Sequence, residues 1–259
     1  MATFLFDETI FGPVISRRLG VSLGVNLLPN DSKVCSFDCI YCECGLNPKN
    51  RERKAILPTR EEVKKLLIKK LEDMAAEGQK PDVITFAGNG EPTLHPEFEG
   101  VIDDTLEVRD QFAPKARVAV LCNSTMLDKP SVFSALNKID DNILKLDSAF
   151  ESTVRIMDCP NKNFSLDHVV ENLKRFKGNL IVQTMFLKGS YQGEAFDNTT
   201  NEEVTAWLKL VKEINPLQVM IYTIARDTPI DTLEKVSVDK LNEIAELVRA
   251  SGLDVQVSG

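Results

Sequence analysis

Apolar runs of strand length alternate with amphipathic stretches of helix length along most of this chain. The runs are rich in Val, Ile, Leu and Phe and contain few polar residues, which is typical of parallel strands covered on both faces. They fall at residues 21–28, 82–87, 117–122, 142–147, 179–186 and 217–224. The pattern therefore predicts six buried strands separated by helices.

Helix start signals stand ahead of four amphipathic stretches. A Ser or Thr that can cap a helix is present at each, namely Thr59, Ser165, Thr200 and Ser237. After Thr59 and after Thr200 a Glu follows three positions later, as in a capping box. Two less regular helices are predicted over residues 97–111 and 130–136.

Strand followed by helix recurs about six times without a linker, which predicts a single α/β domain with parallel strands and right-handed crossovers. Six units can form a partial (β/α)6 barrel or a flat doubly wound sheet, and periodicity does not choose between them. We expect an N-terminal extension at residues 1–20, the core at 21–224, and a C-terminal helix and strand at 237–258. In either case the loops at the carboxyl ends of the strands should build the site.

The composition is that of a globular protein, with 259 residues of which 43% are hydrophobic and 27% charged. The net charge of −8 argues against a protein held to nucleic acid by bulk electrostatics, although a local basic strip is compatible with RNA. The N-terminus lacks a targeting pattern and no run approaches the ~18 apolar residues of a membrane span, so we expect a cytoplasmic protein with no membrane partner. In a reducing compartment, the six cysteines are expected to be metal ligands, reactive thiols or core residues.

The loop after the first predicted strand, residues 29–47, carries Cys35, Cys39 and Cys42. Spacings of three and two residues let one short loop place thiolates around a [4Fe–4S] cluster, since thiolates are the ligands of iron–sulfur centres. Three ligands for four irons leave one iron open. The alternatives are three unrelated core cysteines or a zinc site completed by Cys44. Zinc sites usually pair two separated C-x2-C knuckles, whereas here four cysteines fall within ten residues.

The segment from Cys35 through Cys39 and Tyr41 to Cys42 resembles the C-x3-C-x-aromatic-C signature of the radical S-adenosylmethionine (SAM) superfamily. The resemblance implies a partial barrel in one domain over residues 1–259, with a [4Fe–4S] cluster whose open iron binds SAM. It also implies reductive cleavage of SAM to a 5′-deoxyadenosyl radical that abstracts hydrogen from a substrate, and a flavodoxin or ferredoxin-type electron donor. In relatives the backbone beside the aromatic residue contacts adenine, which would be the role near Tyr41.

A glycine-rich turn follows the second predicted strand and reads Gly88-Asn89-Gly90-Glu91-Pro92. Glycines allow a ligand to approach the backbone closely. The turn resembles the G-G-E-P motif of the superfamily, with Asn89 in place of the second glycine. The resemblance implies that the turn binds the ammonium group of SAM and that Glu91 is its side-chain contact.

Polar residues at the ends of the later strands extend the predicted cofactor site. Asn123 and Ser124 resemble the T-N-G type turn of relatives, with a solvated loop as the alternative. Lys145 and Asp147 face the same side of their strand, either as a structural ion pair or with one of them near the carboxylate or ribose of SAM. Core packing is the alternative for the inward residues of the last two strands. The candidates for cofactor contact on those strands are Gln183 and Tyr222.

Three arginines and one histidine are candidates for substrate contact. Arg226 follows the last predicted strand, where it can anchor an anionic substrate. Arg17 and Arg18, with the basic run at residues 49–54, can meet phosphate, although such runs are usually a solvated face. His95 comes after the glycine-rich turn, where it lines the pocket, caps a helix or lies on the surface.

Residues 12–24, 90–96 and 183–189 together resemble one branch of the superfamily, and the likeness runs from about residue 11 to residue 229. It is the branch of wyosine-base-synthase-like (tRNA imidazoguanosine synthetase-like) iron–sulfur oxidoreductases. The true tRNA-modifying enzymes carry extra N-terminal cysteines, and none precedes Cys35 here. The substrate of this chain therefore does not follow from the resemblance.

Three functions remain open at this point. The first is a radical enzyme acting on a nucleobase or on another small or RNA-borne substrate. The second is an activase that places a glycyl radical on a partner protein, although the order Lys145-Leu-Asp147 differs from the D-x-K arrangement of activases. The third is a zinc or redox module, which leaves the glycine-rich turn unexplained. Cys44, Cys122 and Cys159 lack the spacing of a second cluster; one of them could donate a hydrogen atom, and core packing is the default for the last two.

Overall fold

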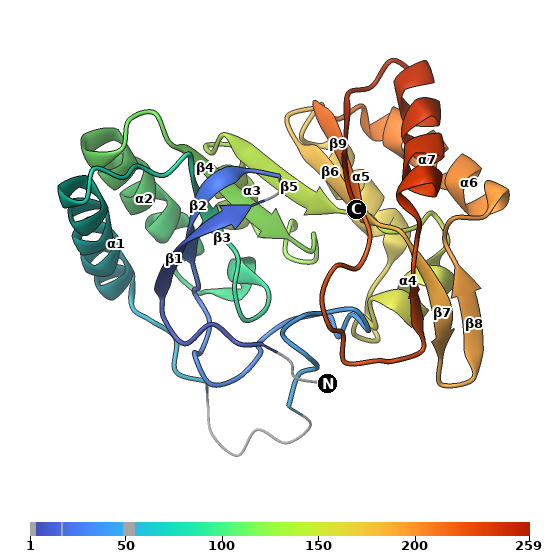
Figure 1. Cartoon of the computed structure of the whole chain (residues 1–259), viewed down its shortest axis with the longest axis horizontal. Helices are drawn as coiled ribbons and strands as arrows, with labels where there is room; N and C mark the ends of the chain where they lie inside the picture. The colour runs from blue at the N-terminus through green and yellow to red at the C-terminus, as the bar shows by residue number, and fades with distance from the viewer. Residues whose placement is uncertain (1–3, 17, 49–54) are drawn as a thin grey trace.

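The computed structural model describes residues 4–16, 18–48 and 55–259, and its centre is a curled eight-stranded sheet (Figure 1). In spatial order the strands are β1 Ile10–Ser16, β2 Gly20–Val25, β3 Val83–Phe86, β4 Arg117–Cys122, β5 Asp141–Lys145, β6 Ile181–Met185, β9 Gln218–Tyr222 and β11 Val255–Ser258. All neighbouring pairs from β2 to β11 are parallel, and β1 pairs with β2 in antiparallel fashion. The six predicted strands are β2, β3, β4, β5, β6 and β9, so the prediction of a partial α/β barrel is confirmed.

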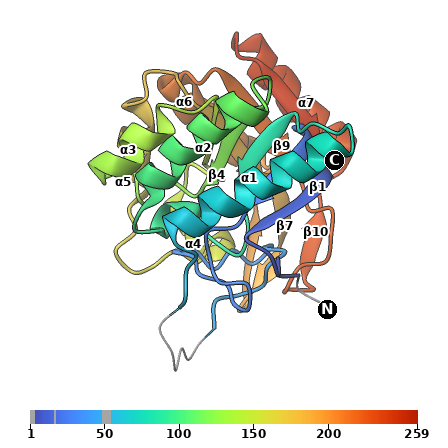
Figure 2. The same cartoon turned by 90° about the vertical axis from the view of Figure 1, so that its left-hand side faces the viewer.

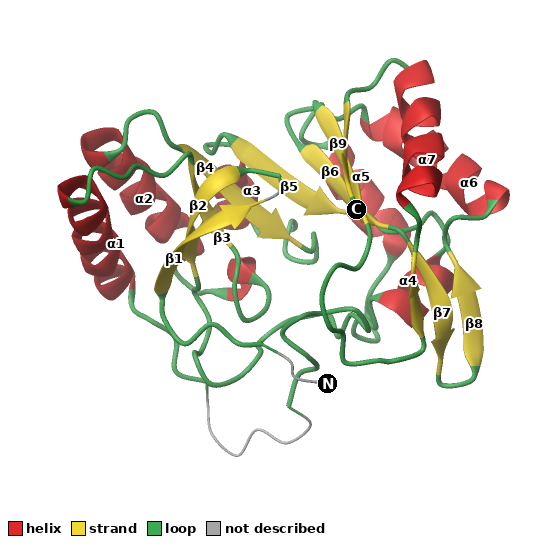
Figure 3. Ribbon diagram, in the orientation of Figure 1, coloured by secondary structure: helices red, strands yellow, loops and turns green. Residues whose placement is uncertain are grey.

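Helices cover the outer, convex face of the sheet (Figure 3). They are α1 Arg60–Ala76, α2 Phe98–Phe112, α3 Pro130–Leu136, α4 Glu151–Met157, α5 Leu166–Lys174, α6 Asn201–Ile214 and α7 Val238–Ala250. The capping predictions are confirmed, because each predicted cap hydroxyl accepts a hydrogen bond from the backbone N–H three residues later. The helices α1, α2 and α3 pack side by side over one half of the sheet (Figure 2).

Alternation along the strands separates the two faces of the sheet. Outward side chains join the helices in the main hydrophobic core, in which the indole of Trp207 is 1% exposed. An inward apolar cluster fills the amino-terminal end of the half-barrel and consists of Val83, Ala119, Ile143, Ile181 and Met220. Two residues further along their strands stand the polar side chains Thr85, Lys145, Gln183 and Tyr222. The interior is therefore apolar at its base and polar at the carboxyl ends of the strands, where α/β barrels build their sites.

Several elements were not predicted from the sequence. The N-terminal extension contains β1, which covers one edge of the sheet. A second, three-stranded sheet has the order β10-β7-β8 and is formed by Leu233–Lys235, Leu187–Tyr191 and Glu194–Asp197. At the other edge of the main sheet, the Gln256 side chain of β11 donates a 3.2 Å hydrogen bond to the carbonyl of Arg18, so the turn after β1 reaches across the half-barrel. None of the described helices has the length and apolarity needed to cross a membrane.

Candidate functional site

The cysteine loop lies between β2 and α1 and is organised by Asn47. The Asn47 side chain accepts a hydrogen bond from the Cys35 N–H (3.0 Å) and donates to the Cys35 carbonyl (3.1 Å). The Cys42 N–H donates to the Cys39 carbonyl at 3.0 Å, which closes the turn between these two cysteines. These bonds hold the three predicted cluster cysteines on one short segment.

Lys33 lies inside this loop, although no role was predicted for it. Its side chain is only 2% exposed, and its ammonium donates to the Gly45 carbonyl at 2.9 Å and lies 3.5 Å from the Asp38 carboxylate. Burial alone would lower the pKa of this amine, but the neighbouring thiols of Cys42 and Cys39 act the other way and the pKa is raised. The loop therefore keeps a permanent positive charge beside its cysteines.

The thiols themselves are buried to different degrees. Burial raises the pKa of Cys35 to about 12 and raises that of Cys39 well above its usual value. A hydrogen bond from the Cys44 thiol lowers the pKa of Cys42 to about 6. Ligation by iron replaces thiol protons, so a cluster would compensate the burial of the first two cysteines. The three sulfurs form a donor set that fits an iron–sulfur cluster, and the buried ammonium of Lys33 would offset part of the negative charge of the thiolates.

The described residues do not show the geometry of a site for a single metal ion. Among the residues that the structure describes, no group of three or more His, Cys, Asp or Glu side chains is arranged around one ion. A cubane cluster distributes its thiolates over separate irons, so its ligands need not converge on one point.

The glycine-rich turn packs directly against the cysteine loop. The Val34 N–H donates to the Asn89 carbonyl at 2.8 Å, and the Glu91 N–H donates to the Val34 carbonyl at 3.1 Å. Gly90 has φ +134°, and a Cβ at this position would lie 1.9 Å from the Val34 carbonyl oxygen. Only glycine fits this close approach, which brings the two predicted motifs together.

Asn89 has a structural role that differs from the predicted cofactor contact. Its side chain accepts a hydrogen bond from the Phe6 N–H (2.9 Å) and donates to the carbonyls of Phe6 and Pro29, both at 2.8 Å. The residue is completely buried. The Asn89 side chain therefore ties the N-terminal segment to the glycine-rich turn.

Glu91 is buried and already engaged by donors of the chain. Its carboxylate accepts hydrogen bonds from the Thr93 N–H (3.0 Å), the Thr93 hydroxyl (2.5 Å) and the Asn123 N–H (2.6 Å). Burial raises its pKa, although these hydrogen bonds favour the ionised form. Glu91 thus joins the glycine-rich turn to the end of β4, and any contact with a ligand must share these oxygens.

The residues after β4 face the cysteine loop. The Asn123 side chain donates to the Ser36 hydroxyl at 2.8 Å and lies 3.5 Å from the Cys35 sulfur. Ser124 has φ +70°, and its hydroxyl donates to the Lys145 carbonyl at 3.3 Å. Both predicted residues therefore lie at the rim between the cysteine loop and β5.

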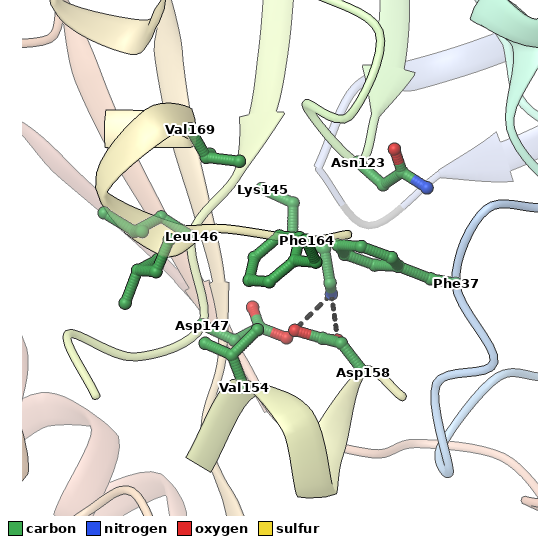
Figure 4. A pocket seen from close by; sticks show the side chains of 10 residues that line it. Phe37, Asn123, Lys145, Leu146, Asp147, Val154, Asp158, Phe164 and Val169 are labelled. Carbon is green, nitrogen blue, oxygen red and sulfur yellow. Dashed lines mark ion pairs between the residues drawn. The ribbon is translucent and has the colours of Figure 1, made fainter. Parts of the chain in front are cut away.

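Lys145 and Asp147 form an ion pair of 2.7 Å at the centre of a buried network (Figure 4). The Lys145 ammonium also lies 3.4 Å from Asp158 and donates to the hydroxyl of Tyr41. The Tyr41 hydroxyl has one proton to donate and lies within hydrogen-bonding distance of both Asp147 and Asp158, and the Cys39 thiol donates to Asp158 at 3.2 Å. The ion-pair alternative is thus the one the structure contains, and the network reaches a predicted cluster cysteine.

Three other predicted residues, Gln183, Tyr222 and Arg226, come from the last strands and the loop that follows them. Gln183 faces the interior from β6, and its side-chain nitrogen is buried without a partner among the described residues. Burial raises the pKa of Tyr222 to about 12, and the guanidinium of Arg18 lies 4.8 Å from the centre of its ring. Arg226 forms an exposed 2.6 Å ion pair with Glu43.

Of the candidates for substrate contact, His95 has a structural role, and Arg17 is not among the described residues. Both ring nitrogens of His95 are engaged, Nε2 donating to the Pro58 carbonyl at 2.8 Å and Nδ1 accepting from the Glu97 N–H at 3.2 Å. His95 is buried and stabilises the entry to α2, so it does not line the interior of the half-barrel. Arg17 and the basic run at 49–54 lie outside the described residues.

The structure adds residues that the sequence analysis missed. The role of Lys33 could have been predicted from the sequence, since a charged residue two positions before a ligand cysteine is a candidate for charge compensation. Asp158 carried none, because its contact with Cys39 spans 119 residues. Of the cysteines without an assigned role, Cys122 is buried in the core as predicted, whereas Cys159 is half-buried in the loop that packs against the cysteine loop.

One family model and several known proteins match this chain. The model of the radical SAM superfamily matches residues 30–192. A Helicobacter pylori UPF0026 protein is 31% identical over 238 residues, covering 90% of this chain and 71% of that protein. The GTPase Obg of Brachyspira hyodysenteriae is 30% identical over 251 residues (95% and 34%), and a UPF0026 protein of Methanocaldococcus jannaschii is 32% identical over 219 residues (82% and 62%). This chain thus spans about a third and about three fifths of the last two relatives.

Solved structures share the fold at low sequence identity. A radical SAM methyltransferase from Sphaerobacter thermophilus superposes with a TM-score of 0.65 at 14% identity, covering 92% of this chain and 65% of that one. Streptococcus suis SuiB bound to SAM gives 0.60 at 17% identity (92% and 47%). An archaeal TYW1 gives 0.52 at 14% identity (89% and 72%). At these identities the likeness concerns the fold alone.

Proposed function

The chain belongs to the radical SAM superfamily and groups with the UPF0026 proteins, and from this premise we propose that Cys35, Cys39 and Cys42 hold a [4Fe–4S] cluster. When bound, this cluster would supply the electron that cleaves SAM to methionine and a 5′-deoxyadenosyl radical, which abstracts hydrogen from a substrate. The chain's own residues then bind and orient the cofactor and the substrate.

The observation that carries the proposal is the contact between the cysteine loop and the glycine-rich turn. Val34 and Gly90 form a parallel bridge, so the turn begins next to Cys35. The Asn123 side chain closes the same gap from β4 by bonding to Ser36. Motifs that lie about 50 and 90 residues apart in the sequence therefore meet at the carboxyl ends of β2, β3 and β4.

Within this arrangement we assign the residues as follows. The backbone near Tyr41 and the turn around Gly90 and Glu91 would both contact SAM. Lys145 and Asp147 hold the Tyr41 side chain in place through buried hydrogen bonds, so they act by positioning. We further propose a nucleobase-like substrate, which is the first of the three functions that the sequence leaves open. A flavodoxin or ferredoxin-type donor and a cytoplasmic location remain predictions.

The test is anaerobic reconstitution with iron and sulfide followed by reduction in the presence of SAM. We expect about four irons per chain and formation of 5′-deoxyadenosine and methionine. Cys39→Ala should lose both the iron and the cleavage. Cys159→Ala is the matched control, because it removes a half-buried thiol from the adjoining loop without removing a proposed ligand, and Cys44→Ala tests the four-cysteine alternative. Loss of iron in Cys44→Ala, or zinc bound by the wild type in place of iron, would favour a four-cysteine site instead.

A further inference from the structure

A cavity of about 900 Å³ opens inside the half-barrel on the side of β1 and β2. Its walls include Phe6, Phe11 and Arg18, with Glu43 and Arg226 at the side nearest the cysteine loop. A smaller cavity of about 60 Å³ shares Arg18, Glu43 and Arg226 and reaches Tyr41 and Tyr222. The large cavity is therefore continuous in its lining residues with the proposed cofactor site, and its volume is in the range of small-molecule sites.

Aromatic side chains form one wall of this cavity. The rings of Phe6 and Phe11 stack with centroids 3.8 Å apart, and Phe4 packs edge-on against Phe6 at 4.8 Å. Phe11 lies directly over Gly24 of β2, where a Cβ would come within 2.1 Å of the ring. The absence of a side chain at Gly24 thus lets the wall lie inside the half-barrel.

Asn89 holds this wall in place. Its side chain bonds to both backbone groups of Phe6, and the Phe4 N–H donates to the Glu43 carbonyl at 2.9 Å. The N-terminal segment is thereby fixed to the glycine-rich turn on one side and to the cysteine loop on the other. Asn89, which stands where the superfamily motif has a glycine, couples the cofactor turn to the cavity wall.

One nitrogen of the Arg18 guanidinium lacks a hydrogen-bond partner among the residues that the structure describes. The Nη1 atom of Arg18 is buried and has no hydrogen-bond acceptor among the described residues. The guanidinium is held over the ring of Tyr222 at 4.8 Å, which fixes its direction. The other cation of the wall, Arg226, is already paired with Glu43, and Asp227 lies at the exposed rim. A buried charged N–H without an acceptor is costly, so a ligand is expected to supply one.

The hydroxyl groups of Ser22 and Thr85 provide a second polar point. They face the interior from β2 and β3 and share a 2.8 Å hydrogen bond, which leaves further donor and acceptor capacity for a ligand. The cavity thus combines a flat apolar wall, a guanidinium with one unsatisfied nitrogen among the described residues, and one neutral polar pair.

We propose that this cavity binds the substrate and that the substrate is a small planar aromatic molecule with one anionic group, a carboxylate or a phosphate, held by Arg18. The proposal rests on the proposed function, since it places the substrate of that enzyme. It identifies Arg18 as the residue that selects the anion and Asn89 as a positioning residue for the aromatic wall.

The test measures binding of three probes by ligand-observed NMR to the anaerobically reconstituted protein with SAM. The probes are 2-naphthoate, 2-naphthyl phosphate and the neutral 2-naphthamide. We expect at least one anion to bind tenfold or more tightly than the amide, because a charge-assisted hydrogen bond at a buried site is worth at least that factor. Comparison of the two anions distinguishes a carboxylate from a phosphate substrate.

Three variants assign this preference to the named residues. Arg18→Gln should remove the preference for the anion while leaving binding of the amide in place, and Arg18→Lys should restore part of it. Arg249→Gln is the matched control, since Arg249 lies on the exposed face of α7 and pairs with Glu246. Asn89→Gly should weaken the binding of all three probes by the same factor, because it frees the aromatic wall but leaves the Arg18 guanidinium unchanged.

Equal binding of anion and amide, or an unchanged preference in Arg18→Gln, would overturn the proposal. Binding of unfractionated tRNA in place of all three probes would overturn it in favour of an RNA substrate. SAM cleavage without added substrate is measured in parallel on the same samples. A failure of cleavage speaks against the proposed function, whereas intact cleavage without anion preference speaks against this inference alone.

Discussion

Replacing Lys145 by Met removes the cation from the buried network between β5 and the cysteine loop. In the native protein its ammonium lies 2.7 Å from Asp147 and 3.4 Å from Asp158, and the side chains of these carboxylates are 0% and 2% exposed. At an effective dielectric constant of about 20 these separations correspond to Coulomb energies of roughly 6 and 5 kcal/mol, which desolvation largely offsets. Removing the cation leaves Asp147, and Asp158 whose pKa burial raises to about 7, without a positive partner, and for such a loss we expect about 3–5 kcal/mol less unfolding free energy.

The assay is urea unfolding in anaerobic, reducing buffer, followed by far-UV circular dichroism. Lys138→Met is the matched control, because Lys138 also pairs with two carboxylates, Glu99 at 3.2 Å and Asp103 at 2.7 Å, but its side chain is 37% exposed. For this surface group we expect a loss of no more than about 1 kcal/mol. Equal losses in the two variants would refute the view that the buried carboxylates depend on Lys145. Adding Asp147→Asn to Lys145→Met should recover part of the loss, since it removes one of the two uncompensated charges.

Three further predictions concern the turn, the core and the cluster loop. Gly90→Ala should destabilise the protein by about 2 kcal/mol or more in the same unfolding assay, because the new Cβ would meet the Val34 carbonyl. Gly78→Ala is the control and should cost less, since Gly78 has φ +72° but no atom within 4 Å of the new Cβ. A larger loss in Gly78→Ala than in Gly90→Ala would contradict this reasoning. Trp207→Ala should cost about 3–5 kcal/mol, since it leaves a cavity and removes the indole N–H that donates to the Thr184 hydroxyl, and a loss below about 1 kcal/mol would show that the site collapses without penalty. Lys33→Met should lower the reduction potential of the reconstituted cluster by an amount on the order of tens of millivolts, because it removes a buried positive charge beside the cysteine ligands. Redox titration followed by electron paramagnetic resonance measures this shift, and an unchanged potential would exclude a charge effect of Lys33 on the cluster.

The sequence by itself determined six strands of the main sheet, the starts of four helices and the two motifs. Strand and helix periodicity predicted the six parallel strands, and Ser and Thr capping signals predicted where four helices begin, because both depend on interactions within a few residues. The spacing of Cys35, Cys39 and Cys42 and the residues of the glycine-rich turn were also visible, since ligand spacing is a local property. Periodicity did not choose between a flat sheet and a curled one, because strand polarity and burial are the same in both.

The tertiary structure decided what these motifs are in contact with. The bonds from Asn89 to Phe6, from Asp158 to Cys39 and from Lys145 to Tyr41 join residues 83, 119 and 104 positions apart. No local pattern encodes such pairs, because they form only when the sheet curls and brings the strand ends together. For the same reason the chain could suggest that Arg18 meets an anion, whereas its position over Tyr222, inside a cavity walled by the N-terminal segment, follows from the fold.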